Sequence, residues 1–297
     1  MNRPVLLPGL PVLRPTRTEL QIGLRPGRQV RLPDTAPVRR TLDRLLRGET
    51  PPPGREADGV LAALAPVLVD GAGLLDPRAE AGDVAAAALR DPSGYTGRLA
   101  ARHATTVTVR GTLGVPAADP RPLLRAAGVR TVEGAAGEPQ GSAAVTLLLC
   151  VGDVDRTELD PLLRRREPHL LVRLLEGDAL VGPFVVPGRT ACLRCLDAHE
   201  AVRDPRSAAL RLRHPDPDDV RADGVAEPVD TALATIAVAW AVRDLVSMLD
   251  GELPSSWSAT VRLTATLSPV TQTEWRRHPA CGCSWLPDEQ LSSTMGA

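Results

Sequence analysis

Apolar and polar residues alternate in the first part of the chain. ELQIGL at residues 19–24 and RQVRL at residues 28–32 follow this pattern on either side of an Arg-Pro-Gly triplet. A period of two is typical of strands with one buried face, and Pro-Gly marks a turn. Apolar residues then recur at helical spacing from Val38 to Leu46, after a Pro-Asp-Thr start. The pattern predicts a β-hairpin followed by a helix.

A second helical stretch follows a turn-rich insert. Prolines and glycines crowd residues 51–59, and residues 59–75 carry enough apolar positions for one or two more short helices. Strands followed by two or three short helices are the outline of a winged helix-turn-helix unit. We therefore predict that residues 1–90 form a winged helix-turn-helix domain.

Strands and helices alternate through the rest of the chain. Runs rich in β-branched or long apolar residues predict strands at residues 105–111, 129–134, 143–155 and 169–177. Residues 83–102 predict an alanine-rich helix and a connector, and helical patterns also occupy residues 121–127 and 158–166. A charged loop at 204–228, a long helix at 230–250 and a late strand at 258–269 follow. Alternating strands and helices predict a parallel sheet covered on both faces. The fold class we expect for residues 91–297 is therefore a Rossmann-like α/β domain.

Four of the five cysteines form two closely spaced pairs. Cys192 and Cys195 are separated by two residues, and Cys281 and Cys283 by one. Two thiolate pairs in tight turns can close a tetrahedral Zn–S site with bonds of roughly 2.3 Å. Such a site leaves no open position for a substrate, so we predict a structural zinc; free buried thiols and an iron–sulfur cluster are the alternatives. Cys150, inside a predicted strand, is expected to be a core thiol.

The composition of the chain excludes several kinds of catalytic and binding site. All 35 basic residues are arginine, because the sequence contains no lysine. A P-loop, a Schiff base and attachment of pyridoxal phosphate each need that amine, so none can be built here. The start is broken by prolines, and the apolar stretch at residues 232–241 is too short to span a bilayer. We expect a cytoplasmic protein without a membrane partner, whose cysteines serve metal or redox chemistry rather than disulfides.

Charge is distributed unevenly along the chain. The net charge of −1 argues against a generally basic nucleic-acid-binding protein. Residues 1–53 nevertheless contain ten arginines and only four acidic residues, which makes this part basic and the remainder acidic. A basic domain indicates an anionic partner. The candidates are DNA and an acidic peptide that adds as a strand beside the hairpin; the third interpretation is a solvated arginine face without a partner.

The cysteine pairs and their surroundings resemble a known family. VGPFVVPGRTACLRCLD at residues 181–197, HPACGC at 278–283 and the helix TALATIAVAWAVRDLVSMLDG between them resemble the ThiF-like superfamily, which includes ubiquitin-activating-enzyme-like and MoeB-like proteins. The resemblance covers most of residues 100–297, and the C-G-C form looks like the ThiF-like proteins of azoline-peptide (TOMM) biosynthesis. Residues 11–85 are similar to the winged-helix leader-recognition domain, a RiPP recognition element, fused in front of that subgroup.

Active members of this family adenylate a carboxylate, and the resemblance indicates where their nucleotide site would lie. The family's G-x-G-x-x-G turn reads V-R-G-T-L-G at residues 109–114. Gly111 and Gly114 remain, but Val109 replaces the first glycine, and a β-branched residue there obstructs a nucleotide. The family's phosphate-binding lysine cannot exist in this chain. ATP binding is therefore not expected.

Two acidic residues and one arginine complete this vestigial site. Glu133 stands where the family has an acid on the ribose, and Asp153 where it has a metal-binding aspartate. The stretch after Glu133 is shorter than in the active family, which implies that a catalytic segment is missing. Arg110 is expected to be a solvated turn residue, with replacement of the phosphate-binding lysine as the alternative.

The resemblance implies a role in making azoline peptides. It implies a scaffold without catalytic residues that binds the leader of a ribosomal precursor peptide and presents the peptide to a YcaO-type cyclodehydratase, which forms thiazoline or oxazoline rings. We assign leader binding to Gln29, Val30 and Arg31 on the second strand and to Arg40 and Arg44 on the helix. A homodimer is common among ThiF-like proteins. The alternatives are an ATP-dependent adenylating enzyme acting on a peptide carboxylate and a winged-helix DNA-binding regulator.

Overall fold

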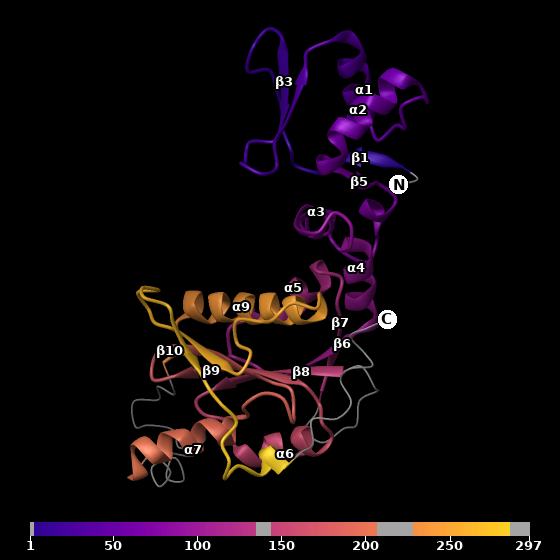
Figure 1. The fold of residues 1–297 in the computed structure, drawn as a ribbon. Helices are drawn as coiled ribbons and strands as arrows, with labels where there is room; N and C mark the ends of the chain where they lie inside the picture. The colour runs from indigo at the N-terminus through magenta and orange to yellow at the C-terminus, as the bar shows by residue number, and fades with distance from the viewer. Residues whose placement is uncertain (1–2, 135–143, 207–227, 286–297) are drawn as a thin grey trace. The chain divides into compact units, whose positions relative to one another are not determined.

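The computed structural model describes residues 3–134, 144–206 and 228–285, and most of the loop predicted at 204–228 lies outside these ranges. The chain divides into two compact units (Figure 1). Unit 1 comprises Met1–Ala100 with Ala126–Gly128, and unit 2 comprises Ala101–Arg125 with Val129–Ala297.

Unit 1 contains the hairpin and the helix that the apolar pattern predicts. Its three-stranded antiparallel sheet has the order β2-β3-β4, so β4 is an edge strand. The strands are β2 (Val12–Leu13), β3 (Glu19–Ile22) and β4 (Val30–Pro33), and the helices that follow are α1 (Ala36–Leu46) and α2 (Arg55–Leu64). Val38, Leu42 and Leu45 form the buried side of α1 and pack in one apolar cluster with β3 and β4.

The rest of unit 1 joins the start of the chain to the segment after α2. β1 (Pro4–Leu6) pairs antiparallel with β5 (Leu68–Asp70), a contact between distant segments that the local pattern does not predict. Two helices, α3 (Ala81–Arg90) and α4 (Tyr95–Ala104), occupy the stretch where the sequence predicts one helix and a connector. Short 3-10 turns, η1 (Ala65–Val67) and η2 (Gly73–Leu75), lie between them and α2.

Seven strands form a mixed sheet in unit 2, in the order β12-β11-β10-β9-β8-β6-β7. They are β6 (Thr106–Gly111), β7 (Arg130–Glu133), β8 (Ala144–Val151), β9 (His169–Leu175), β10 (Asp178–Val185), β11 (Ala259–Leu263) and β12 (Thr271–Glu274). The strands β6 to β9 pair in parallel, as predicted. The other three pair antiparallel, so the prediction of a parallel sheet is wrong for that half.

The change of direction begins at a two-residue turn. Glu176 and Gly177 connect β9 to β10, and both have positive φ, 53° and 81°. This backbone is typical of a tight hairpin turn, and a return to a parallel strand would need a crossover of a dozen residues or more. The chain therefore reverses direction at the Glu-Gly pair.

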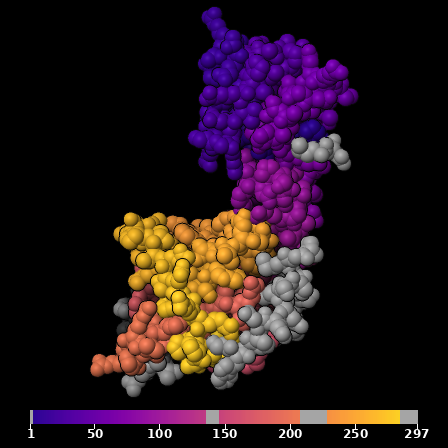
Figure 2. Space-filling view, in the orientation of Figure 1, coloured from indigo at the N-terminus to yellow at the C-terminus, as the bar shows by residue number. Residues whose placement is uncertain are grey.

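Helices cover both faces of the seven-stranded sheet, as predicted (Figure 1). On one face lie α9 (Thr231–Leu249), α5 (Pro120–Ala126) and the turn η3 (Pro116–Ala118). On the other lie α6 (Arg156–Arg164) and α7 (Leu193–Arg203), with the turn η4 (Gly282–Trp285) near the end of the chain. In the space-filling view, the orange and yellow segments, which include α9 and β11, form one continuous surface of unit 2 (Figure 2).

The helix α9 is longer than the apolar stretch considered from the sequence. By length and composition alone its 19 residues could cross a membrane, which corrects the expectation that this stretch is too short. In the structure, 56% of its most apolar window is buried inside the protein. Leu233, Val238 and Leu245 are among the buried residues, as in the core helix of a folded domain.

A buried ion pair joins the last turn of α4 to the end of α9, within unit 2. Arg102 Nε donates to Asp250 Oδ1 at 2.7 Å, and Arg102 Nη2 donates to Asp250 Oδ2 at 2.7 Å. The side chain of Arg102 is 2% exposed and that of Asp250 is fully buried. Two parallel charge-assisted hydrogen bonds fix the distance and the orientation of both helix ends.

We predict that removing one partner of this pair is far more costly than removing both. Arg102→Met takes the guanidinium away from a buried carboxylate and should lower the free energy of unfolding by about 3–5 kcal/mol, whereas the double variant Arg102→Met/Asp250→Leu should recover most of that loss. Urea denaturation followed by tryptophan fluorescence measures this, because all four tryptophans belong to unit 2.

The exposed pair Arg262–Asp178 provides the control, because the Arg262 side chain is 58% exposed. Arg262→Met should change the free energy of unfolding by no more than about 1 kcal/mol. Equal losses in the Arg102 and Arg262 variants would contradict the structural importance of the buried pair.

Candidate metal centre

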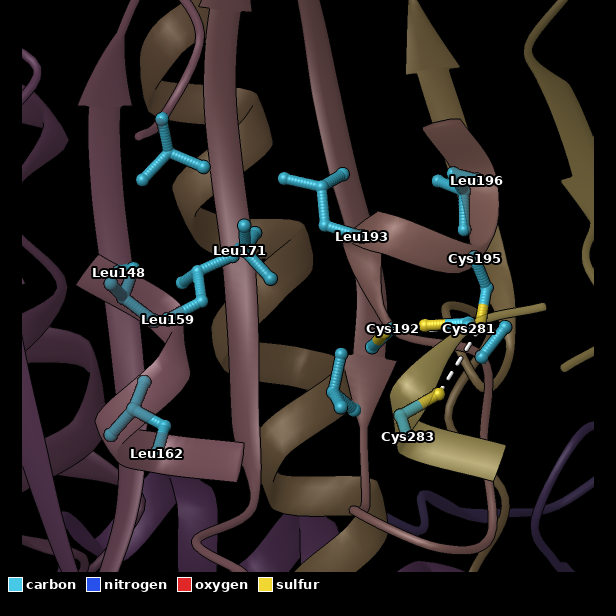
Figure 3. Packing of buried hydrophobic residues seen from close by; sticks show 13 residues of the cluster. Leu148, Leu159, Leu162, Leu171, Cys192, Leu193, Cys195, Leu196, Cys281 and Cys283 are labelled. Atoms are coloured by element: carbon cyan, nitrogen blue, oxygen red, sulfur yellow. Dashed lines mark hydrogen bonds between the residues drawn. The ribbon is translucent and has the colours of Figure 1, made fainter. Parts of the chain in front are cut away.

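Four cysteine side chains from two distant segments meet in unit 2 (Figure 3). The Sγ atom of Cys192 lies 3.8 Å from that of Cys195 and 3.6 Å from that of Cys281. The Sγ atoms of Cys195 and Cys283 are 3.2 Å apart, and all four sulfur atoms lie within 4.8 Å of one another. All four residues are buried, and they continue an apolar cluster that includes Leu148 of β8.

Local backbone geometry turns each pair of thiols inward. Cys192 is the N-cap residue of α7, and the N–H of Cys195 donates to the carbonyl of Cys192 at 2.9 Å. In the second segment, the N–H of Cys281 donates to the carbonyl of His278 at 2.9 Å, which closes the turn before η4. Each pair is therefore positioned by a turn of its own, and only the tertiary fold brings the two turns together.

Arg277 links the two cysteine segments. Its Nη2 donates to the carbonyl of Cys283 at 2.9 Å, and its Nη1 donates to the carbonyl of Gly188, in the turn before Cys192. Sequence reasoning missed this residue, because nothing in the pattern around Arg277 indicates that its guanidinium reaches a turn so far back in the chain.

The sulfur geometry fits a tetrahedral metal ion. Four Zn–S bonds of about 2.3 Å place neighbouring sulfur atoms about 3.8 Å apart. The three measured Sγ–Sγ distances lie between 3.2 and 3.8 Å. The cluster is consistent with a structural zinc, and its four ligands would leave no position for a substrate.

Protonation supports the same interpretation. A hydrogen bond from Cys192 lowers the pKa of Cys281 to about 7, and hydrogen bonds from the neighbouring thiols also lower the pKa of Cys195. The pKa of Cys192 is raised, chiefly because of its hydrogen bond with Cys195. The thiols thus compete for protons, and a divalent cation would end this competition by binding all four as thiolates.

The residues of the predicted nucleotide site lie at a different place, at the carboxyl ends of β6 to β8. Gly111 ends β6 with a φ of 74°, and a Cβ there would lie 2.1 Å from the carbonyl oxygen of Leu149. The close packing of β6 and β8 is therefore enough to explain the glycine at this position, and no bound ligand is needed to explain it. Gly114, with a φ of 69°, lies in the turn that follows. Glu133 ends β7, is exposed, and forms an ion pair with Arg121.

Asp153, just after β8, lies between two guanidinium groups. Its Oδ1 accepts a hydrogen bond from Arg173 Nη1 at 2.7 Å, and its Oδ2 lies 2.9 Å from Arg156 Nη2. Arg156 also makes two hydrogen bonds of 2.8 Å to Asp197. Burial alone would raise the pKa of Asp153, but the hydrogen bond from Arg156 and the charge of Arg173 outweigh it and hold the pKa well below its usual range.

This arrangement opposes a magnesium ion at Asp153. Both carboxylate oxygens are committed to arginines, and a dication would be repelled by the two positive charges beside them. Sequence reasoning identified the aspartate but missed Arg156 and Arg173, which decide its chemistry.

The residues assigned to leader binding occupy two places in unit 1. Val30 and Arg31 lie on β4 and Gln29 just before it; Arg31 Nε donates to Gln21 on β3 at 3.2 Å. Arg40 and Arg44 are exposed on α1, on the side opposite to the residues that pack on the sheet. The structure therefore does not bring the arginines of α1 to the edge of β4.

The fold of the chain is found among solved structures. No protein-family model matches the chain, and no curated protein matches its sequence. Solved chains do match in fold, and three of them are described below: two heterocyclases and E. coli MccB.

Three structures show the extent of the likeness. The heterocyclase TruD has a TM-score of 0.67 and 16% identity, over 95% of this chain and 42% of its own. A heterocyclase in complex with substrate and cofactor has a TM-score of 0.66 and 18% identity, and the match covers 94% of this chain and 39% of that heterocyclase. E. coli MccB, solved with MccA, has a TM-score of 0.57 and 11% identity, and the match covers 95% of this chain and 99% of MccB. The likeness defines the fold, and the chain spans about two fifths of either heterocyclase.

We predict that the isolated protein contains one zinc ion per chain and that Cys192→Ser loses it. Unit 2 should then unfold at a lower temperature, because buried thiols lose the ion that holds the two segments together. Metal analysis and thermal unfolding by tryptophan fluorescence test this. Cys150→Ser, which changes a thiol outside the cluster, should keep both the metal and the stability. A Cys192→Ser protein with full metal content would refute the site.

We also predict that Asp153 makes unit 2 sensitive to acid. Its folded pKa lies below that of the unfolded chain, about 3.9, so its stabilising effect is complete above that value and is lost as the pH falls below it. Asp153→Asn should be less stable than wild type at pH 7, and the difference should shrink below about pH 4. Urea midpoints measured from pH 7 to pH 2 test this.

Asp160→Asn is the control for this titration, because Asp160 pairs with the exposed Arg194. Its urea midpoints should follow those of wild type throughout. A constant difference between wild type and Asp153→Asn at every pH would show that the carboxylate charge does not matter.

Proposed function

We propose that the protein is a leader-peptide-binding scaffold without catalytic activity of its own, which recruits a ribosomal precursor peptide to a YcaO-type cyclodehydratase for azoline formation. The observation that carries the proposal is a fold shared with a heterocyclase and with MccB, which was solved with MccA. At the strand ends where a nucleotide would bind, the acidic residues are paired with arginines. We place the protein in the cytoplasm and assign the zinc a structural role.

The first support is the state of the nucleotide end. The acid that would bind a metal, Asp153, is neutralised by Arg156 and Arg173, and the acid that would bind a ribose, Glu133, is paired with Arg121. Val109 replaces a glycine, and no lysine is present to bind a phosphate. These features argue against adenylation, which needs charge compensation at the transferred phosphate.

The second support is the free edge of β4. The N–H of Asp34 donates to the carbonyl of Thr18 at 2.8 Å, which sets the alternation of the antiparallel ladder. Val30 and Leu32 then bond to β3, so the backbone groups of Gln29 and Arg31 point away from the sheet. The N–H and C=O of Arg31 are thus available to a peptide that adds as a further strand.

The edge is limited to a few residues. Pro33 has no N–H, and its carbonyl already accepts a hydrogen bond from the N–H of Thr35 at 2.9 Å. An added strand would therefore pair mainly with Gln29 and Arg31. Main-chain pairing over so short a stretch supplies modest affinity, so side-chain contacts have to supply the selectivity.

The arginines of α1 are suited to attracting an acidic peptide by charge rather than to contacting it at the edge of β4. Arg40 and Arg44 lie one turn apart on the exposed side of the helix, and no acidic side chain among the described residues forms an ion pair with either. Unpaired cations on one surface raise the local concentration of an acidic peptide. The same charges favour DNA, so the test below includes it.

The partner enzyme is inferred from the heterocyclases. TruD aligns with this chain over 42% of its own length, which leaves more than half of that heterocyclase without a counterpart in residues 1–297. We assign the ring-forming step to a YcaO-type partner, and MccB, solved with MccA, gives the precedent for peptide binding by this fold. The scaffold would act by raising the effective concentration of peptide at that enzyme.

We predict that the full-length chain binds the leader of a precursor peptide encoded beside its gene, as measured by fluorescence anisotropy. Arg31→Pro removes the outward N–H and should weaken binding about tenfold or more, which corresponds to about 1.4 kcal/mol, while Arg31→Ala keeps that N–H and should stay within about threefold of wild type. The double variant Arg40→Ala/Arg44→Ala should lose affinity at low salt, with a smaller loss at high salt.

Arg17→Ala, another exposed arginine of unit 1, is the control and should bind as wild type does. Equal binding by wild type and Arg31→Pro would refute the β4 edge. No leader binding together with ATP–pyrophosphate exchange would favour an adenylating enzyme, and no leader binding together with salt-sensitive retention on duplex DNA would favour a DNA-binding regulator.

A further inference from the structure

Arg110 is the most unusual charged residue of unit 2. It lies on β6, and the expectation that it is a solvated turn residue is wrong, because only 8% of the residue is exposed. Its Nε and Nη2 atoms are buried without a hydrogen-bond partner. No hydrogen bond or ion pair joins its side chain to any part of the chain that the structure describes.

The acidic residues near Arg110 do not compensate its charge. Glu167 accepts a hydrogen bond from Thr146 and pairs with Arg165 at 3.3 Å. Glu133, at the end of the neighbouring β7, pairs with Arg121. Burying an unpaired guanidinium costs several kcal/mol, so a fold that retains one has to gain something in return.

A second unpaired polar group lies on the same face of the sheet. His169 is fully buried, and its Nδ1 bonds to the carbonyl of Glu167 at 3.0 Å, so Nδ1 carries the proton and Nε2 is an acceptor. The structure gives Nε2 no partner. Thr108, Thr146 and His169 are register neighbours on β6, β8 and β9, and Arg110 is two residues beyond Thr108 on the same face.

Two further observations place the guanidinium near this row. Burial is the main reason why the pKa of His169 is lowered to about 4, and the positive charge of Arg110 adds to the effect. A Cβ on Gly134 would lie 2.2 Å from Thr108 Cγ2 and 3.2 Å from Arg110 Nε, so the side chain of Arg110 extends beside Thr108. Arg110 Nε therefore lies beside Thr108 and Gly134, towards β7, and His169 lies on the same face of the sheet two strands away, on β9.

We infer that Arg110 is the anchor of a small-molecule site that takes an oxyanion group, either a phosphate or a carboxylate. The guanidinium donates hydrogen bonds to the oxygen atoms of the oxyanion. The neutral His169 accepts a hydrogen bond from a water or from a hydroxyl group of a ligand that extends from Arg110 across the sheet towards β9. The site lies on the α6 face of the sheet and extends from Arg110, near the end of β6, towards His169 at the start of β9. It is independent of leader binding in unit 1.

Thermal unfolding of the full-length protein tests this site through the tryptophans of unit 2. Sodium phosphate and sodium acetate are the two probes, with sodium chloride at matched ionic strength as the reference. At a concentration about one hundred times its Kd, an oxyanion that occupies the site should raise the Tm of wild type by about 5–10 °C. The probe that produces the shift identifies the ligand as a phosphate or a carboxylate.

Arg110→Met and Arg125→Met separate the site from general salt effects. Arg125 is an exposed arginine of α5, so Arg125→Met should respond as wild type does. Arg110→Met should lose the oxyanion-dependent shift, and without oxyanions its Tm should equal or exceed that of wild type, because an unpaired buried charge has been removed. Arg110→Gln serves the same purpose if the methionine variant does not fold.

Two results would overturn the inference. Equal Tm shifts in wild type and in the Arg110 variants would show that the oxyanion acts elsewhere. A much lower Tm of both Arg110 variants in chloride alone would show that the protein itself stabilises the guanidinium, without a ligand.

Discussion

The meeting of four thiols is the constraint on which the α6 and α7 side of unit 2 depends. The turn before α7 and the turn near residue 281 are far apart in sequence, and the sulfur atoms that join them touch one another inside an apolar cluster (Figure 3). Four buried thiols cannot all ionise unless a cation compensates their charge. A bound metal would satisfy them at once, and it would tie the late segment of the chain to the helices that cover the sheet.

Arginine provides the other fixed points of unit 2. Arg102 holds Asp250 with two parallel hydrogen bonds, and Arg277 bridges the two cysteine turns through backbone carbonyls. Arg156 and Arg173 enclose Asp153. A lysine has one point charge where a guanidinium has a planar set of donors, so arginine can serve two acceptors at once in such places. A chain without lysine is therefore rich in rigid, bidentate contacts.

Arginines also pair with the acids at the carboxyl ends of the parallel strands. The sheet is similar to those of MccB and TruD, and in this chain the acids at the carboxyl ends of β7 and β8, Glu133 and Asp153, are paired with arginines. Gly111 is needed for the approach of β6 to β8 and says nothing about a ligand. The edge of β4 in unit 1, where the backbone groups of Arg31 point away from the sheet, is the place that we propose for a peptide.

The sequence by itself determined the features that depend on local pattern. Alternation gave the hairpin β3–β4, helical spacing gave α1 and α9, and the cysteine spacing selected the four residues that the fold unites. The antiparallel half of the sheet was missed, because a two-residue turn decides strand direction and its glycine resembled any other loop glycine. The partners of Asp153, the role of Arg277 and the burial of Arg110 were decided only by tertiary structure. These depend on contacts between segments that are distant in the chain, where hydrogen-bond geometry and desolvation, rather than periodicity, fix what a side chain can do.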